Sequence, residues 1–166
     1  FADYPLGAEA PGVSVLQQSR ALAFGLGGLS KSVGLPQVKV AWIGVAGPAA
    51  LVAEAMAGLE IVADTYLSVS TLAQLALGEL LLRGAVVRTA IQGRVAGNLE
   101  RLRHALRGAS ATTLLEPRGG WSAVVQVPAT HGEEALALAL IEDDGVLVHP
   151  GYFFDFPREA FVVVSL

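Results

Sequence analysis

The chain has 166 residues, of which 53% are hydrophobic and 16% are charged, with a formal net charge of −4 and no cysteine. Without cysteine it has no disulfide, no thiolate nucleophile and no cysteine-based metal site. The negative charge argues against a nucleic-acid partner, and the uncharged stretch at residues 40–53 is too short to cross a bilayer and contains Gly47 and Pro48. We therefore expect a cytoplasmic protein with no membrane and no nucleic-acid partner.

Apolar runs separated by turn residues predict the elements of the first half of the chain. Proline at position 48 suits the first turn of a helix. The expected elements, in order, are a short helix at 13–18, a buried strand at 21–26, a Gly/Ser/Pro loop at 27–36, a second buried strand at 38–45, and helices at 49–63 and 71–83.

A long amphipathic helix is expected next. Six apolar residues recur at intervals of three or four, which places them on one helical stripe: Val87, Ile91, Val95, Leu99, Leu102 and Leu106. The other faces carry Arg88, Arg94, Arg101, Arg103 and Arg107. A solvated polar face explains these arginines, with a phosphate-rich partner as the alternative. Gly108 ends the helix.

The tail has a different periodicity. Short apolar runs predict strands at 112–115, 121–127, 146–148 and 161–165, and residues 133–141 are expected to form a helix. This alternation indicates a small α+β unit. We place the domain boundary near residues 108–110.

The basic residues are unevenly distributed, because the chain has nine arginines but only two lysines, Lys31 and Lys39, in one nine-residue window. Arginine stays protonated, whereas a desolvated lysine can lose its proton and form an imine. One interpretation of this segment is an ordinary glycine-rich turn with an exposed lysine. A second is a nucleotide phosphate loop, since Gly25 and the run from Ser30 approach G-x-x-x-x-G-K-[ST]. Ser30 replaces the second glycine of that motif, however.

A third interpretation rests on a resemblance. The segment contains three groups of residues at fixed spacing, namely Gly28-Leu29-Ser30-Lys31, Gly34-Leu35 and Lys39. With this spacing it resembles the lysine signature of fold type I, class I and II aminotransferases. The run Val146-Leu147-Val148-His149-Pro150-Gly151 resembles the family's valine-proline-glycine turn, and residues 161–165 resemble its last core strand. Residues 1–6 resemble the stretch that follows the aspartate of the family's cofactor-binding strand. The resemblance covers essentially the whole chain, and it implies that the first half of such an enzyme lies upstream.

The resemblance implies an α/β protein with two parts. Residues 1–108 would form the C-terminal part of the large cofactor-binding domain, a mostly parallel sheet with helices that ends in the long helix. Residues 109–166 would form the small C-terminal α+β domain. The family is usually homodimeric with shared active sites, so a homodimer is expected.

The resemblance also implies a site and a reaction. Lys31 would hold pyridoxal 5'-phosphate as a Schiff base and act as general acid and base while an amino group passes between an amino acid and a keto acid. Ser30 and Lys39 would bind the cofactor phosphate. A lysine at position 39 supplies a point charge where the family's arginine supplies a bidentate fork.

One position departs from the family pattern. Val163, two residues before Ser165, stands where the family has its carboxylate-binding arginine. Arg158 and His149 are then the remaining candidates for substrate contact. No His, Asp or Glu cluster has metal-ligand spacing, so no metal is expected. The alternative hypothesis is a non-catalytic fragment or a degenerate relative that acts only as a folding or association module.

Overall fold

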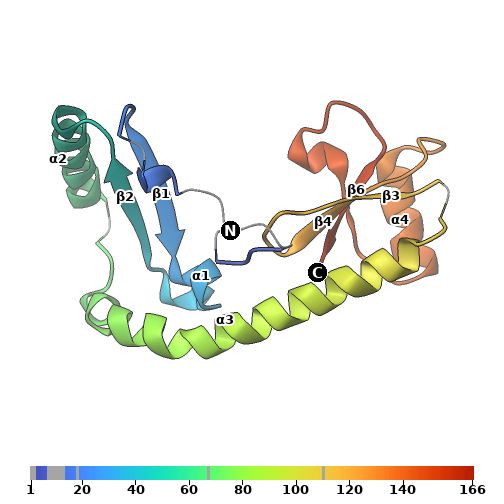
Figure 1. Cartoon of the computed structure of the whole chain (residues 1–166), viewed down its shortest axis with the longest axis horizontal. Helices are drawn as coiled ribbons and strands as arrows, with labels where there is room; N and C mark the ends of the chain where they lie inside the picture. The colour runs from blue at the N-terminus through green and yellow to red at the C-terminus, as the bar shows by residue number, and fades with distance from the viewer. Residues whose placement is uncertain (1–2, 7–13, 18, 67, 110) are drawn as a thin grey trace. The chain divides into compact units, whose positions relative to one another are not determined.

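The computed structural model describes residues 3–6, 14–17, 19–66, 68–109 and 111–166. The chain divides into two compact units, one of residues 1–10 with 91–166 and the other of residues 11–90. Helices and sheets occur in both units (Figure 1), so the mixed α/β class expected from the sequence is confirmed. The domain boundary near residues 108–110 stays a prediction.

The unit of residues 11–90 contains a pair of antiparallel strands, β1 (Ala23–Gly28) and β2 (Ala41–Ala46). The chain between them forms the helical turn α1 (Leu29–Ser32) and the 3₁₀ helix η2 (Pro36–Val38). The expected loop at 27–36 is therefore wrong in part, since the segment continues β1 and then turns helical. The expected parallel pairing is also not seen between these strands. The N–H of Leu29 donates to the carbonyl of Val40 at 3.0 Å, so both ends of the connection meet at the same end of the strand pair.

The two strands are less buried than their sequence predicts. Leu26 of β1 is 81% exposed, and Phe24 and Ile43 are exposed too. The 3₁₀ helix η1 (Val15–Gln17) lies over part of the pair, where the side chain of Leu16 fills the space left by Gly25 and Gly44. Residues 13 and 18 of the predicted short helix lie outside the described residues. The prediction of burial fails because an apolar run shows what a strand can bury, whereas its burial depends on which segments cover it.

A small hydrophobic core anchors the connection between β1 and β2. Leu29, Val33 and Val40 are buried and pack against residues from the first turns of α3 (Thr71–Leu106), namely Ala73, Leu77, Leu80 and Leu81. The helix approaches closely at Gly84, because a Cβ built on this glycine would lie 2.5 Å from the Cβ of Val33. The connection is thus held by its own apolar residues against one helix.

The helical segments are longer than predicted. Helix α2 spans Ala49–Thr65. The expected helix at 71–83 and the long helix after it are one continuous helix, α3, of 36 residues. Gly84 does not interrupt it, since this glycine packs against Val33 rather than ending the helix. The predicted apolar stripe is confirmed at Val95 and Leu99, each 2% exposed, whereas Val87 is 45% exposed.

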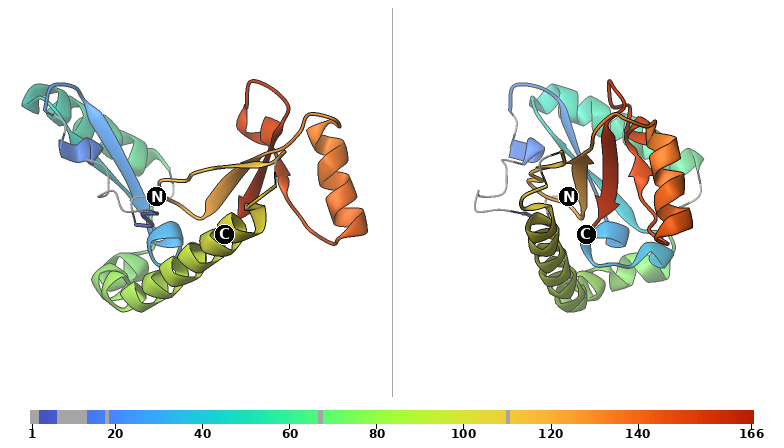
Figure 2. Two further views of the ribbon diagram at one scale, coloured as in Figure 1. Left: turned by 45° about the vertical axis from the view of Figure 1, so that its right-hand side comes forward. Right: turned by 90° about the vertical axis from the view of Figure 1, so that its right-hand side faces the viewer.

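The other unit contains a four-stranded antiparallel sheet in the order β3-β4-β6-β5. The strands are β3 (Thr113–Leu115), β4 (Ser122–Gln126), β5 (His149–Pro150) and β6 (Phe161–Ser165). Helix α4 (Glu133–Asp143) lies beside this sheet in both views of Figure 2. Leu136, Ala137 and Leu140 of α4 pack against Val125, Val148 and Val162.

Three of the four predicted strands are found, and one is displaced. A strand was expected at 146–148, but the pairing residues are His149 and Pro150, opposite Val163 and Val162. The apolar run misleads because Val146 and Leu147 are exposed, and only Val148 enters the core. Near the start of the chain, Leu6 packs with Val95 and Leu99, while residues 1 and 2 lie outside the described residues.

Candidate functional site

Lys31 lies on the helical turn α1, directly after β1. The backbone of Leu29 fixes this turn, because its carbonyl accepts hydrogen bonds from the N–H groups of Val33 at 3.2 Å and Leu35 at 3.1 Å. Leu29 and Ser32 point inward and are buried, whereas Lys31 is exposed and Ser30 is half-buried. The turn therefore has a buried inner side and carries Lys31 on its exposed side.

Lys39 lies at the other end of the same connection. It follows η2 and has φ 58°, so its backbone is left-handed, a conformation that residues other than glycine adopt with some strain. Its neighbour Val40 is buried in the core with Leu29. The tight turn thus sets where the Lys39 side chain leaves the backbone.

Ser30, Lys31 and Lys39 therefore share one short connection. A primary amine, a hydroxyl and a second ammonium group form a donor set that suits a small phosphorylated aldehyde, with the amine bonding to the aldehyde carbon and the other two groups binding the phosphate. The turn ends at Ser32, and Gly34 has φ 70°, so no helix continues from the lysine. A nucleotide phosphate loop needs a helix that begins at its lysine, and this connection has none.

His149 and Arg158 lie in the other unit. His149 is on β5 opposite Val163 of β6, so the two side chains project from the same face of the sheet. The imidazole lies 6.0 Å and 6.2 Å, between ring centroids, from Phe153 and Phe154 of the 3₁₀ helix η3 (Gly151–Phe154). His149 thus stands at the edge of a cluster of exposed aromatic side chains.

The guanidinium carbon of Arg158 lies 5.5 Å from the centroid of the Phe161 ring, in cation–π contact. Arg158 is exposed and close to the start of β6.

A buried carboxylate near the turn was not identified from the sequence as a site residue. Glu133, the first residue of α4, is 2% exposed and accepts hydrogen bonds from three backbone N–H groups, those of Tyr152 at 2.9 Å, Ala160 at 2.9 Å and Phe161 at 2.8 Å. Burial by itself would raise the pKa of Glu133, but these hydrogen bonds outweigh it and lower the pKa below its ordinary value. The sequence showed only an acidic residue at a helix start, which is ordinary there.

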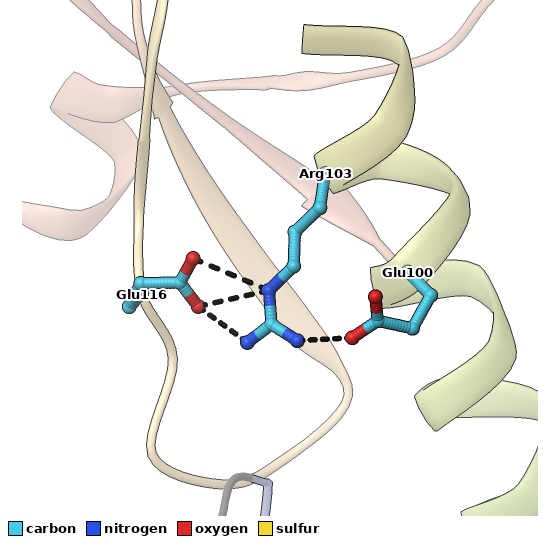
Figure 3. Close-up of polar contacts among 3 residues, drawn as sticks. All are labelled: Glu100, Arg103 and Glu116. Atoms are coloured by element: carbon cyan, nitrogen blue, oxygen red, sulfur yellow. Dashed lines mark hydrogen bonds and ion pairs between the residues drawn. The ribbon is translucent and has the colours of Figure 1, made fainter. Parts of the chain in front are cut away.

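A second charged cluster serves the fold. Figure 3 shows Arg103 of α3 between Glu100 and Glu116, with both ion pairs drawn. The Nε of Arg103 lies 3.2 Å from both carboxylate oxygens of Glu116, and this contact lowers the pKa of Glu116. The bidentate pair ties α3 to the segment after β3. It uses one of the arginines predicted to lie on the polar face of the long helix.

In the part of the chain that the structure describes, no group of three or more His, Asp or Glu side chains is arranged to hold a metal ion. None of the described helices is both long enough and apolar enough to cross a bilayer.

Comparisons with known proteins give a consistent picture. Residues 7–165 match the model of the family described as aminotransferase class I and II. An aminotransferase from Escherichia coli has a similar structure, with a TM-score of 0.81 and 20% identity over 98% of this chain and 42% of that one. An alanine aminotransferase from Pyrococcus furiosus also gives 0.81, with 14% identity over the same shares of both chains.

An aspartate aminotransferase from Thermotoga maritima gives a TM-score of 0.63 and 23% identity over 86% of this chain and 35% of that one. The chain thus spans well under half the length of these similar structures. The curated proteins contain no match.

Proposed function

Because this chain belongs to the class I and II aminotransferases, we propose that it forms the lysine-bearing part of a pyridoxal-phosphate enzyme that transfers amino groups between an amino acid and a keto acid. The observation that carries the proposal is the placement of Lys31. It is exposed on a short turn whose inner side is buried, in the segment that resembles the family's lysine signature.

Lys31 is the covalent anchor of the cofactor in this proposal. Its four-carbon arm carries a primary amine from a fixed turn, and the same amine can remove a proton from the substrate carbon and return it elsewhere. Pyridoxal phosphate, when bound, supplies the electron sink that makes this proton acidic. The chain's own contribution is thus to position one amine.

Ser30 and Lys39 are the proposed phosphate ligands. The Ser30 hydroxyl adjoins Lys31 on α1, and Lys39 lies at the far end of the same connection, which the bond between Leu29 and Val40 closes. A hydroxyl donor and an ammonium charge are both favourable for a phosphate dianion. Position 39 is expected to tolerate arginine, which keeps the charge.

His149 and Arg158 are the proposed substrate contacts. Val163 is buried and apolar on the face of the sheet that it shares with His149, so position 163 cannot bind a carboxylate by charge. The imidazole of His149 and the exposed guanidinium of Arg158 are proposed to contact the substrate instead. We further propose a cytoplasmic homodimer, with a domain boundary near residues 108–110.

The test is chemical trapping of the cofactor. The protein is incubated with pyridoxal phosphate, reduced with borohydride and mapped by mass spectrometry. The expected adduct lies on the peptide that contains Lys31, is lost in Lys31→Arg and persists in the matched variant Lys39→Arg. An unmodified Lys31 in the cofactor-saturated protein would refute the assignment and favour a non-catalytic fragment.

A further inference from the structure

The turn after β5 is held by one buried carboxylate. Glu133 Oε1 accepts the N–H groups of Ala160 and Phe161, and Oε2 accepts that of Tyr152. The backbone of Gly151 also lowers the pKa of this carboxyl group. A single side chain therefore joins the start of α4 to the turn η3 and to the first residue of β6.

The glycine of the Pro150-Gly151 pair is explained by the same carboxylate. A Cβ built on Gly151 would lie 2.9 Å from Oε1 of Glu133 and 3.0 Å from Cβ of Phe161. Any side chain at position 151 would therefore displace the carboxylate or the strand. Glycine leaves the space in which the carboxylate meets the peptide N–H groups.

The turn has little apolar burial of its own to hold it. Tyr152, Phe153 and Phe154 are 47%, 61% and 53% exposed, and Asp155 closes the turn in a left-handed conformation with φ 55°. Hydrogen bonds to a charged acceptor are roughly twice as strong as neutral ones. Glu133 thus adds a charged hydrogen bond at Tyr152, next to the pairing of β5 with β6, to the backbone from which these aromatic side chains project.

We propose that Glu133 is a positioning residue for substrate binding: its carboxylate holds residues 149–154 so that His149 and the neighbouring aromatic rings keep their places. This inference rests on the proposed function, in which this turn faces the substrate. Glu133 acts through the turn and does not itself touch a ligand. Its loss is therefore expected to weaken substrate binding more than it slows the chemical step.

The test compares Glu133→Gln with Glu134→Gln in the full-length protein. Glu134 is the next residue of α4 and is exposed, so its variant removes the same charge without touching the turn. Glu133→Gln keeps the size but places an amide N–H group against backbone donors. Rates are measured with pyruvate as acceptor and the common L-amino acid that reacts fastest as donor, alongside hydrogen exchange of the backbone amides.

We expect Glu133→Gln to raise KM for the donor about tenfold or more with a smaller change in kcat, since a displaced contact removes binding that is present before the reaction. Exchange at Tyr152 and Phe161 is expected to quicken at least about tenfold. The adduct on Lys31 should be unchanged, and Glu134→Gln should match the wild type throughout. If Glu133→Gln does not fold, Glu133→Asp replaces it, with a smaller rise in KM expected.

Three results would overturn the inference. Unchanged exchange in the Glu133 variant would show that the carboxylate does not hold the turn. Fast exchange with unchanged KM would show that the turn does not set substrate binding. A protein without the Lys31 adduct and without activity toward any donor would refute the proposed function and the substrate role with it, while the exchange rates would still decide whether Glu133 holds the turn.

Discussion

Gly84 is the position where the structure makes its sharpest prediction about stability. In an exposed helix, replacing glycine with alanine stabilises by about 1 kcal/mol, because alanine has the higher helix propensity. At Gly84 the new Cβ would lie 2.5 Å from Cβ and 2.6 Å from Cγ1 of Val33, which is fully buried. Overpacking of this kind costs about 1–3 kcal/mol, so Gly84→Ala is expected to destabilise by about 1 kcal/mol.

Gly78 supplies the matched control. It lies on the same helix, is exposed, and a Cβ built on it would meet nothing within 4 Å. Gly78→Ala is therefore expected to stabilise by about 1 kcal/mol, so that the two variants differ by about 2 kcal/mol in the free energy of unfolding. Urea denaturation followed by far-ultraviolet circular dichroism measures both.

The double variant Gly84→Ala with Val33→Gly tests the cause, because glycine at position 33 lacks the Cβ and Cγ atoms that the new methyl group would meet. If the collision is with Val33, the two substitutions should be coupled, and the double variant should lose less stability than the sum of the single variants. If Gly84→Ala were as stabilising as Gly78→Ala, the close contact between α3 and the lysine-bearing connection would be refuted.

Three further outcomes are expected. Leu29→Ala should lower the free energy of unfolding by about 2–5 kcal/mol, because this leucine is fully buried near Lys31 in the chain. Leu26→Ala should lower it far less, since Leu26 is 81% exposed. Equal losses in the two variants would contradict the assigned core. Arg103→Gln should lower the urea midpoint at low salt and less so at high salt, because its ion pairs are partly exposed and screened; a difference independent of salt would argue against an electrostatic role. The folded-state pKa of Glu133 lies below the ordinary value of 4.5, so its contribution to the free energy of unfolding is complete above that pH and is lost as the pH falls through the folded pKa. The free energy of unfolding should therefore decrease below about pH 4.5 in an acid series. A Glu133→Gln variant whose stability decreases with the same slope in acid would contradict this.

The periodic elements could be predicted from the sequence, because periodicity is a local property. The strand at Phe161–Ser165 was predicted with its observed bounds, and helix α4 begins at the predicted Glu133. The stripe through Val95 and Leu99 is buried as its spacing predicts. An apolar helix face gains free energy when another segment covers it, and at Val95 and Leu99 this cover includes Leu6.

The candidate site was predictable only in part. The spacing of Ser30, Lys31 and Lys39 predicted this connection as a candidate site, because these residues are near one another in the chain. Glu133 could not be found in this way, since its partners Tyr152 and Phe161 lie 19 and 28 residues away. Burial of a carboxylate depends on donors that distant segments supply, and an acidic helix start gives no sign of them.

The sequence by itself thus determined the class of the fold, most of its helices and strands, and the segment that carries Lys31. Only the tertiary structure decided that α3 runs unbroken through Gly84, that the strand after α4 pairs at His149, and that Leu26 stays exposed. The physical reason is the same for all three. Each of these features depends on tertiary contacts with another segment. The local sequence shows the propensity of a residue, but not which residues pack against it.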